Sequence, residues 1–449
     1  MGASRGEFTS RLGFIMAAAG SAVGLGNIWG FPTQTATNGG AAFVLVYLIL
    51  AFCLAYPAFM AEILIGRYGQ ANAVTSLEKI SRSQIQKRFA FIVGFGGIVC
   101  AALILSFYGI LAGWMTSYAV ESGASIIGAT SVAEWAVSDS IARNIFFCAV
   151  FMFLTVIIIR NGVEDGIEKW SKRLMPAMIG LLILLIIYVL TLDGADKGLQ
   201  AYLNPDISRV LDPDLLISAL GQAFFSLSLG TSVMVIYGSY ISKKENMVTI
   251  GAQVTFIDVS IAFLAGLLVI PAMYVALEQG VQIFAEDGSL LAGPTLVFQV
   301  LPSLFDSMGQ LGVFVSLAFF ILMSIAALTS SISMLEGPVS YLVERHNIER
   351  KTATTWTGIG ILAISFVIIF NIDTMLDFVA TLATEYGQPI IAMLCCVFAG
   401  WIWQRNSLIE EIKQGNEQVE STLFWKIWPW YTKFVCPLAI AAVFIHSFT

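Results

Sequence analysis

The chain has 449 residues, of which 57% are hydrophobic and only 12% are charged. Soluble globular proteins carry about 25% charged residues, so this composition excludes a water-soluble protein. The net charge of -7 argues against a nucleic-acid partner, because phosphate backbones attract basic surfaces. Apolar runs of about 20 residues recur along the chain, and a helix of that length crosses a bilayer. We therefore expect an all-α polytopic membrane protein embedded in a lipid bilayer.

The hydropathy pattern predicts eleven transmembrane helices. They cover residues 11–37, 41–66, 88–118, 143–160, 168–192, 214–241, 248–279, 308–342, 352–371, 374–403 and 427–448. The segment 281–306 is polar and interrupted by prolines, so we expect a structured loop there. If the N-terminus is cytoplasmic, all of the 23 Lys and Arg residues except Arg143, Lys197 and Arg209 fall on the cytoplasmic side. The positive-inside rule thus predicts a cytoplasmic N-terminus and an outer C-terminus in a bacterial plasma (inner) membrane.

The first span is interrupted near its middle by the stretch 19–27, which contains three glycines, an Asn and a Ser. Non-helical backbone at bilayer depth is tolerated only where it is buried in protein or lines a cavity. A helix broken here would point amide N–H groups at an anion and leave carbonyl oxygens for a cation. The alternative is a Gly-rich packing face that lets helices approach closely. A matching interruption in the second half of the chain would favour the broken helix.

Single polar residues mark the next two spans. Glu62 lies about one turn inside the cytoplasmic end of the second span, where an ionisable residue is costly. We favour a carboxylate that accepts hydrogen bonds from the backbone of a broken helix over a direct functional role. Tyr108, near the centre of the third span, needs a partner for its hydroxyl, which is either protein or an anionic ligand.

The sixth span contains the matching interruption, since residues 222–232 are rich in Ser, Thr and Gly within an otherwise apolar helix. Helices 1 and 6 then begin two five-helix sets, over 11–192 and 193–403. An odd number of spans per set inverts the second set relative to the first, and paired interruptions in inverted repeats indicate a transporter binding site. Residues 1–10 form a cytoplasmic N-terminus, and 404–449 form a cytoplasmic loop and helix 11.

The later spans add isolated polar residues. Asp258 lies deep in the seventh span, where an unpaired carboxylate would be costly. The eighth span carries hydroxylated residues, which alone are weak indicators because they often bond to their own helix. Glu385 in the tenth span has no evident partner and is a candidate proton site. The six cysteines and two histidines lack the spacing of metal sites or catalytic triads, so we expect no enzyme.

Taken together, these motifs resemble the neurotransmitter:sodium symporter family, in its bacterial amino-acid branch. The resemblance covers helices 1 to 10 in order. It rests on Arg11-Leu12-Gly13-Phe14, Gly24-Leu25-Gly26-Asn27-Ile28-Trp29, Phe31-Pro32, Asn38-Gly39-Gly40, Glu62, Gly66-Arg67-Tyr68-Gly69, Phe225-Ser226-Leu227-Ser228-Leu229-Gly230 and Thr329-Ser330-Ser331. It implies the LeuT-type fold, a 5+5 inverted repeat with discontinuous helices 1 and 6, and eleven transmembrane helices where many relatives have twelve.

The resemblance also implies two sodium sites. The first would comprise the Ala22 carbonyl, Asn27, Ser226, Asp258 and the substrate carboxylate. The second would comprise the carbonyls of Gly20, Val23 and Ala326 and the hydroxyls of Thr329 and Ser330. Such sets suit a hard cation, which takes oxygen ligands. If the substrate carboxylate binds the first ion, each ligand raises the affinity for the other equally.

An amino-acid substrate would then lie between helices 1, 3, 6 and 8. The implied contact residues are Ser21, Ala22, Gly24, Leu25, Gly26, Ile104, Tyr108, Phe225, Ser226, Ser228, Thr231, Ser330 and Met334. Amine-transporting relatives carry an Asp at the position of Gly24, so the glycine favours a substrate with a free carboxylate. The apolar lining with small hydroxyls favours a neutral, hydrophobic or aromatic amino acid.

The resemblance implies an inner and an outer gate, and this chain has only some of the residues of these gates. The implied inner gate comprises Arg5, Tyr240 and Glu344, with Glu336 stabilising the cytoplasmic end of helix 8. At the outer gate Asp377 remains, but Gly30 stands where most relatives have its arginine partner, which leaves Phe225 and Tyr108 as an aromatic lid. Chloride-dependent relatives carry a serine one turn beyond Asp258, whereas this chain has Ala262, so we expect transport without chloride.

These features predict sodium-coupled symport of the amino acid into the cell by alternating access. Two alternatives remain open from the sequence. One is a proton-coupled amino-acid carrier that uses Glu385, and the other is a membrane amino-acid sensor with the same pocket and little turnover.

Overall fold

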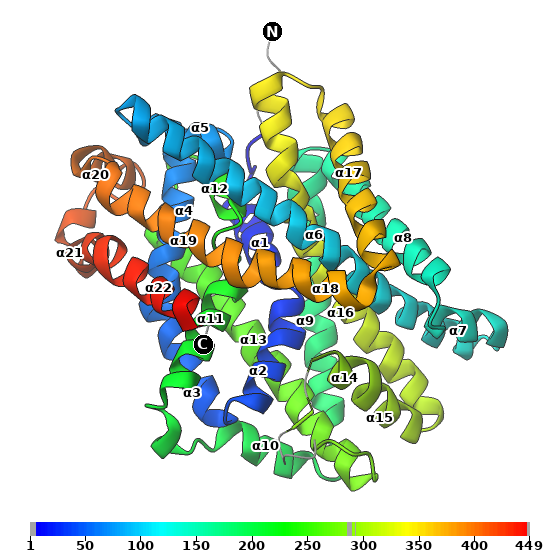
Figure 1. Cartoon of the computed structure of the whole chain (residues 1–449). Coiled ribbons are helices and arrows are strands. Elements are labelled where there is room, and N and C mark those ends of the chain that lie inside the picture. Colours follow the sequence, from blue (N-terminus) through cyan, green and yellow to red (C-terminus); the bar gives the residue numbers. More distant parts are fainter. Residues whose placement is uncertain (1–5, 285–289, 292, 447–449) are drawn as a thin grey trace.

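The computed structural model describes residues 6–284, 290–291 and 293–446, and the described chain is a bundle of helices (Figure 1). The α-helices are α1 (Arg11–Ala22), α2 (Phe31–Thr37), α3 (Ala41–Leu50), α4 (Tyr56–Gly69), α5 (Ala73–Ile80), α6 (Gln84–Ile126), α7 (Thr130–Val137), α8 (Ile141–Arg160), α9 (Lys169–Val189), α10 (Ala195–Leu203), α11 (Pro213–Ser226), α12 (Val233–Ser239), α13 (Met247–Glu278), α14 (Gly293–Thr295), α15 (Leu301–Ser307), α16 (Gln310–His346), α17 (Arg350–Phe370), α18 (Ile372–Ala380), α19 (Gln388–Val397), α20 (Arg405–Lys413), α21 (Leu423–Trp430) and α22 (Cys436–His446). Seven π-helical segments join or extend them, namely Gly26–Gly30, Ala51–Ala55, Val163–Glu168, Leu296–Val300, Thr381–Gly387, Phe398–Ile402 and Tyr431–Val435. Two short 3-10 turns cover Ile207–Arg209 and Val419–Ser421.

The all-α fold predicted from the sequence is confirmed. Among the described residues, nine continuous helices are long and apolar enough to cross a membrane. They are Ala41–Gly69, Gln84–Ile126, Ile141–Arg160, Val163–Val189, Met247–Glu278, Gln310–His346, Arg350–Phe370, Ile372–Ile402 and Leu423–Ile445. A tenth span consists of Arg11–Ala22 and Gly26–Thr37, which are bent by 52° at the predicted break.

The predicted sixth span corresponds to α11 and α12, which are separated by residues 227–232. These two helices have 14 and 7 residues, so neither is long enough to cross a bilayer alone. By length and composition, the described residues therefore form ten spans. The interrupted pair α11 and α12 lies where the sequence predicts the sixth span, and counting this pair as one span gives the predicted total of eleven.

The predicted loop 281–306 is partly helical, which corrects the sequence interpretation. A short helical stretch covers Gly293–Ser307, and its apolar residues Leu296, Leu301 and Leu304 are buried. Pro302 lies inside this stretch, directly after the π-helical segment Leu296–Val300, and the chain stays helical through it. The prolines of this segment therefore do not exclude a helix. Residues 285–289 and 292 of the segment lie outside the described residues.

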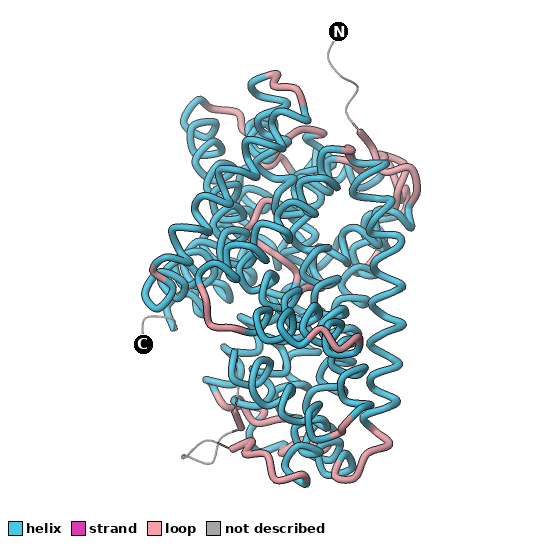
Figure 2. Tube along the Cα trace, turned by 90° about the vertical axis from the view of Figure 1, so that its right-hand side faces the viewer, coloured by secondary structure: helices cyan, strands magenta, loops and turns pink. Residues whose placement is uncertain are grey.

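The first helix lies inside the bundle. Figure 1 shows α1 among the surrounding helices, and it packs against α9, α13 and α16. The residues Ala17–Ala22 of α1 are buried and small, which lets neighbouring helices approach its backbone closely. The helices α5 and α20 lie toward one end of the molecule, and α10, α14 and α15 lie toward the other (Figure 1). Figure 2 shows the bundle from the side, with most of the chain in helices.

A buried ion pair fastens α20 to the end of α4. Arg67 in the last turn of α4 is fully buried, and its Nε lies 2.7 Å from Glu411 Oε1. The same guanidinium donates to the Glu411 and Glu245 carbonyl oxygens. Lys243 places its Nζ 2.8 Å from the other Glu411 oxygen. One carboxylate thus joins three segments that are far apart in the sequence.

Replacing Arg67 should destabilise the protein strongly. The Arg67→Met variant would leave the Glu411 carboxylate buried with only Lys243, and removing one partner of a buried pair costs about 3–5 kcal/mol. The matched control is Arg345→Gln, which breaks the partly exposed pair with Glu78. The control should change the free energy of unfolding by at most about 1 kcal/mol. Chemical denaturation in detergent compares the two, and equal losses would contradict a special role for the buried pair.

Candidate functional site

The two helix breaks lie against each other at the centre of the bundle. The first separates α1 from the π-helical segment Gly26–Gly30, and the second separates α11 from α12. Ser228, which has a left-handed φ of 54°, donates from its hydroxyl to the Ser21 carbonyl across the breaks at 3.1 Å. Gln222 on α11 donates to the Gly26 carbonyl at 2.8 Å. Side chains of the sixth span therefore bond to backbone carbonyls beside the break in the first span.

A small cavity of about 50 Å³ lies between these breaks, α6 and α16. Every residue predicted to contact the substrate lines it except Ser226, so the structure brings together Ser21, Ala22, Gly24, Leu25, Gly26, Ile104, Tyr108, Phe225, Ser228, Thr231, Ser330 and Met334. Phe107 and Gln388 also line it and were not anticipated. The Leu25 amide donates to the Tyr108 hydroxyl at 3.2 Å, so this tyrosine has a protein partner. A Cβ added at Gly24 would overlap Ser330 Oγ and lie 2.8 Å from the Tyr108 hydroxyl, so a glycine keeps the cavity open.

A buried polar cluster lies beside this cavity, at the predicted first sodium site. Asn27 Nδ2 donates to Asp258 Oδ1 at 2.7 Å and to Ser226 Oγ at 3.0 Å, and Ser226 Oγ donates to Asp258 Oδ2 at 2.8 Å. Asp258 is fully buried and forms no ion pair with any basic residue of the described chain. A buried carboxylate without a positive partner is very costly. The cluster therefore fits a cation, and its oxygens are the ligands that a hard cation takes.

The five residues predicted for the second sodium site also converge. Ser330 Oγ on α16 lies 3.4 Å from the Gly20 carbonyl oxygen and 3.2 Å from that of Val23. Thr329 Oγ1 lies 2.9 Å from the Ala326 carbonyl oxygen. A Cβ at Gly20 would lie 3.3 Å from Thr329 Cβ, so the glycine permits the two helices to meet here. Carbonyls of α1 and hydroxyls of α16 are thus available to one small cation.

The preferred interpretation of Glu62 is confirmed. Its Oε1 accepts a 2.7 Å hydrogen bond from the amide of Gly230, which lies in the break between α11 and α12. Gly230 has a φ of 79°, and a Cβ there would overlap the Gln388 carbonyl oxygen. A carboxylate on the second span therefore satisfies an amide that the broken sixth span cannot satisfy itself.

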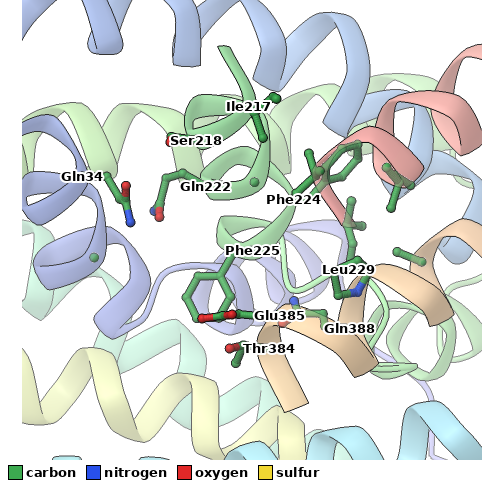
Figure 3. Close-up of a pocket in the computed structure, with 16 residues that line it drawn as sticks. Gln34, Ile217, Ser218, Gln222, Phe224, Phe225, Leu229, Thr384, Glu385 and Gln388 are labelled. Atoms are coloured by element: carbon green, nitrogen blue, oxygen red, sulfur yellow. The ribbon is translucent and has the colours of Figure 1, made fainter. Parts of the chain in front are cut away.

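A larger cavity of about 490 Å³ adjoins the small one and forms a vestibule to it, and its walls are drawn in Figure 3. Phe225 and Gln388 line both cavities and so form the partition between them. Gln34 and Gln222 enter from α2 and α11, and Glu385 from the opposite wall (Figure 3). Glu385 is the one ionisable residue among those that line this vestibule.

Gly30 also borders the vestibule, where the resemblance leads one to expect an arginine. A Cβ at Gly30 would meet the Gln222 amide at 3.7 Å, so the neutral Gln222 occupies the adjacent space. Asp377, the expected acidic partner, is exposed on α18 and is not among the vestibule residues. The acidic residue that shares the vestibule lining with Gly30 is Glu385.

At the opposite end, the predicted inner-gate residues form two separate groups. The Tyr240 hydroxyl donates to buried Glu336 at 2.6 Å, and Arg350 forms a two-pronged ion pair with the same carboxylate, the shorter contact being 2.5 Å. Glu344 accepts from the backbone amide of Asn72 at 2.5 Å. Arg5, the predicted partner of Glu344, lies outside the described residues.

A carboxylate that the sequence interpretation missed holds the N-terminal segment. Glu168, at the start of the fifth span, accepts from the Thr9 amide at 2.7 Å and from the Thr9 and Ser10 hydroxyls at 2.8 and 2.9 Å. Lys172 pairs with it at 2.5 Å, and a Cβ at Gly13 would overlap it. The Thr9-Ser10 pair before an apolar run could have indicated such a contact, because Ser and Thr at the start of a helix form hydrogen bonds with nearby polar groups.

Comparisons with known proteins agree on one family. The chain matches the sequence profile of the sodium:neurotransmitter symporter family over residues 5–144 and 134–449. The uncharacterized sodium-dependent transporter YhdH of Bacillus subtilis (strain 168) is 33% identical over 98% of this chain and 97% of its own length. The sodium- and chloride-dependent taurine transporter of Bos taurus is 30% identical over 76% of this chain and 61% of its own length. Among solved structures, MhsT in complex with L-phenylalanine has a TM-score of 0.83 and 36% identity, over 98% of this chain and 99% of MhsT.

The glycine at position 230 can be tested by a pair of variants. Gly230→Ala would combine a left-handed backbone with overlap of a carbonyl oxygen, whereas Gly280→Ala keeps a similar φ of 84° with open space around its Cβ. The control should cost about 1–2 kcal/mol from backbone strain alone. Gly230→Ala should cost about 1–3 kcal/mol more, because overpacking is added. Thermal unfolding measures both, and equal costs would show that the contact with Gln388 does not constrain the break.

Proposed function

Because the chain belongs to the sodium:neurotransmitter symporter family, and is a sodium-dependent transporter and not an enzyme, we propose that it imports a neutral amino acid together with Na⁺. The observation that carries the proposal is the buried Asn27–Ser226–Asp258 cluster beside a cavity that the two helix breaks enclose. The Asp258 carboxylate is fully buried and has no basic partner in the described chain. A cotransported cation that binds next to it would compensate its charge.

Two sodium ions are part of the proposal. The first would bind Asn27, Ser226, Asp258 and the Ala22 carbonyl, and the second would bind the cluster around Thr329 and Ser330. A substrate carboxylate at the first ion would complete its oxygen shell. Each ligand then raises the affinity for the other by the same factor, which couples sodium binding to substrate binding.

A hydrophobic or aromatic amino acid suits the cavity best. Ile104, Phe107 and Met334 make one part of its wall apolar, and the small hydroxyls of Thr231 and Ser330 make another part weakly polar. Among the described residues, no Asp, Glu, Lys or Arg lines this cavity, so a charged side chain would find no partner there. The similarity to MhsT, whose structure contains L-phenylalanine, supports the same class.

Alternating access would use the groups at the two ends. On the outer side, Phe225 and Gln388 form the partition that must move for substrate to pass, with Tyr108 behind it. On the inner side, Tyr240, Glu336 and Arg350 join the end of α12 to α16 and α17, and Glu168 holds the segment before α1. The roles of Arg5, Glu344 and Asp377 in gating belong to the same proposal.

The membrane arrangement follows the charge distribution. We place the N-terminus, α5 and α20 on the cytoplasmic side of a bacterial plasma membrane, because the basic residues of the chain concentrate there. The C-terminus then lies outside. The proposed division is a cytoplasmic segment 1–10, inverted repeats 11–192 and 193–403, and a final part 404–449. Neither the proton-coupled carrier nor the sensor is favoured, since the relatives are named sodium-dependent transporters.

Transport should not require chloride. The residue one turn after Asp258 is the buried and apolar Ala262, which offers an anion no ligand. The Asp258 carboxylate already provides a negative charge, and a chloride beside it would be repelled. The taurine transporter, which is sodium- and chloride-dependent by name, would differ in this respect.

Sodium-dependent stabilisation is the first test. The purified protein is heated with each of the twenty amino acids, in Na⁺ and in K⁺. A ligand that binds only the folded state at a hundredfold excess over its Kd stabilises by about 2.7 kcal/mol. We expect one or a few neutral, hydrophobic or aromatic amino acids to raise the unfolding midpoint in Na⁺ alone.

The variant Asp258→Asn should lose this sodium dependence, whereas the exposed control Asp306→Asn should retain it. Uptake of the same amino acid into proteoliposomes along a sodium gradient would distinguish a transporter from a sensor. Stabilisation that is equal in both salts would contradict the proposed coupling.

The chloride prediction needs only an exchange of anions. Replacing chloride by gluconate on both sides of the proteoliposome membrane should leave the initial rate of sodium-driven uptake unchanged. A steep loss of rate in gluconate would show that Asp258 does not substitute for the anion.

A further inference from the structure

A separate cavity lies away from the transport path, where the end of the tenth span meets the start of the last span. Its volume is about 300 Å³. The π-helical segments Phe398–Ile402 and Tyr431–Val435 meet here, and a Cβ at Gly400 would lie only 2.7 Å from Lys433 Cα. The cavity lies beside this close contact, and residues of α20 and α21 form the rest of its wall. Neither predicted sodium site nor the substrate cavity shares a lining residue with it.

Two buried polar atoms on the wall of this cavity lack a partner. Trp403 is 5% exposed and Thr432 is 1% exposed, and both line the cavity. Trp403 Nε1 and Thr432 Oγ1 have no hydrogen-bond partner within the described part of the chain. Buried polar groups in proteins are almost always hydrogen-bonded, so these two groups need a partner that the described chain does not supply. Because an indole N–H can only donate, the ligand must provide an acceptor.

The charged residues of the cavity are both basic. Arg405 and Lys433 line it, and no carboxylate does. Lys433 Nζ lies 4.3 Å from the centre of the Trp401 ring, and the Arg405 guanidinium lies 5.5 Å from the centre of the Trp425 ring. Aromatic rings hold these cations in place, and neither forms an ion pair with an acidic residue of the described chain. Their positive charges are thus available to an anion.

The surroundings are those of a membrane surface. Tryptophan is enriched at the level of lipid headgroups, and Trp401 and Trp430 next to this cavity are 57% and 67% exposed. Below them the exposed apolar residues Val435 and Leu438 continue along the last span. Basic pockets between helices on the cytoplasmic side are typical binding sites for anionic headgroups. An anion that carries apolar chains would use both parts of this surface.

We propose that this cavity binds the phosphate group of an anionic phospholipid from the cytoplasmic leaflet. The phosphate oxygens accept from Trp403 Nε1 and Thr432 Oγ1, and Arg405 and Lys433 balance their charge. The acyl chains run along Val435 and Leu438. A free phosphate could use the same donors, but it would leave the apolar surface beside them uncovered.

The test uses the purified full chain in detergent, with phosphatidylglycerol, phosphatidylcholine or inorganic phosphate added at equal concentration. Phosphatidylglycerol should raise the unfolding midpoint and stay bound in native mass spectrometry, whereas the other two should not. The Arg405→Gln/Lys433→Gln variant should bind phosphatidylglycerol at least about tenfold more weakly, because each basic residue near an anionic surface adds to the attraction. The matched control, Lys351→Gln/Lys426→Gln, removes two exposed charges outside the cavity and should bind as the parent does.

Two further variants separate the cavity from general surface charge. Trp403→Phe and Thr432→Val each remove one of the unpartnered polar groups and keep both cations, so each should weaken phosphatidylglycerol binding. Equal stabilisation by phosphatidylcholine would overturn the proposal, as would an equal loss in the control pair. Stabilisation by inorganic phosphate alone, to the same extent, would replace the lipid by a free anion and also overturn it.

Discussion

A polar backbone group in the middle of a membrane protein must find a partner inside the protein, and this requirement organises the whole molecule. Both helix breaks expose such groups, and side chains from other segments bond to several of them. The Gly230 amide bonds to Glu62, and the Gly26 and Ser21 carbonyls bond to Gln222 and Ser228. These hydrogen bonds connect the first, second and sixth spans to one another. The substrate cavity lies between the two breaks that they hold in place.

The same requirement bears on the sodium site that we propose at Asp258. Asn27 and Ser226 use both Asp258 oxygens, which orients the carboxylate but leaves its charge uncompensated. Hydrogen bonds from neutral groups lower the cost of burying that charge without removing it. A site of this kind is more stable with a cation than without one, and this difference is what a sodium gradient can use to drive a conformational cycle.

The sequence predicted the helix breaks correctly, because the type of residue and its position in a span both indicated an interruption. Interruptions rich in Gly and Ser identified both breaks, and the resemblance to the family implied most of the residues that line the cavity. Phe107 and Gln388 had no comparable signal, because an aromatic or an amide within a span does not reveal which helix it faces. Glu168 and Arg350 were missed because their partners come from other helices. The helix at Gly293–Ser307 was missed because its prolines suggested interruption, although the chain stays helical through Pro302.

The ion pair between Arg67 and Glu411 has a consequence for biosynthesis. Its two residues are 344 positions apart, so Arg67 reaches its place in the membrane long before its partner is made. At about 5–20 residues per second, ribosomes need about 20–70 seconds to produce the intervening chain. During that time the guanidinium must stay hydrated or be held by the insertion machinery, because burying it alone would be too costly. We therefore expect Arg67 at the end of α4 to reach its buried position only after α20 has been made.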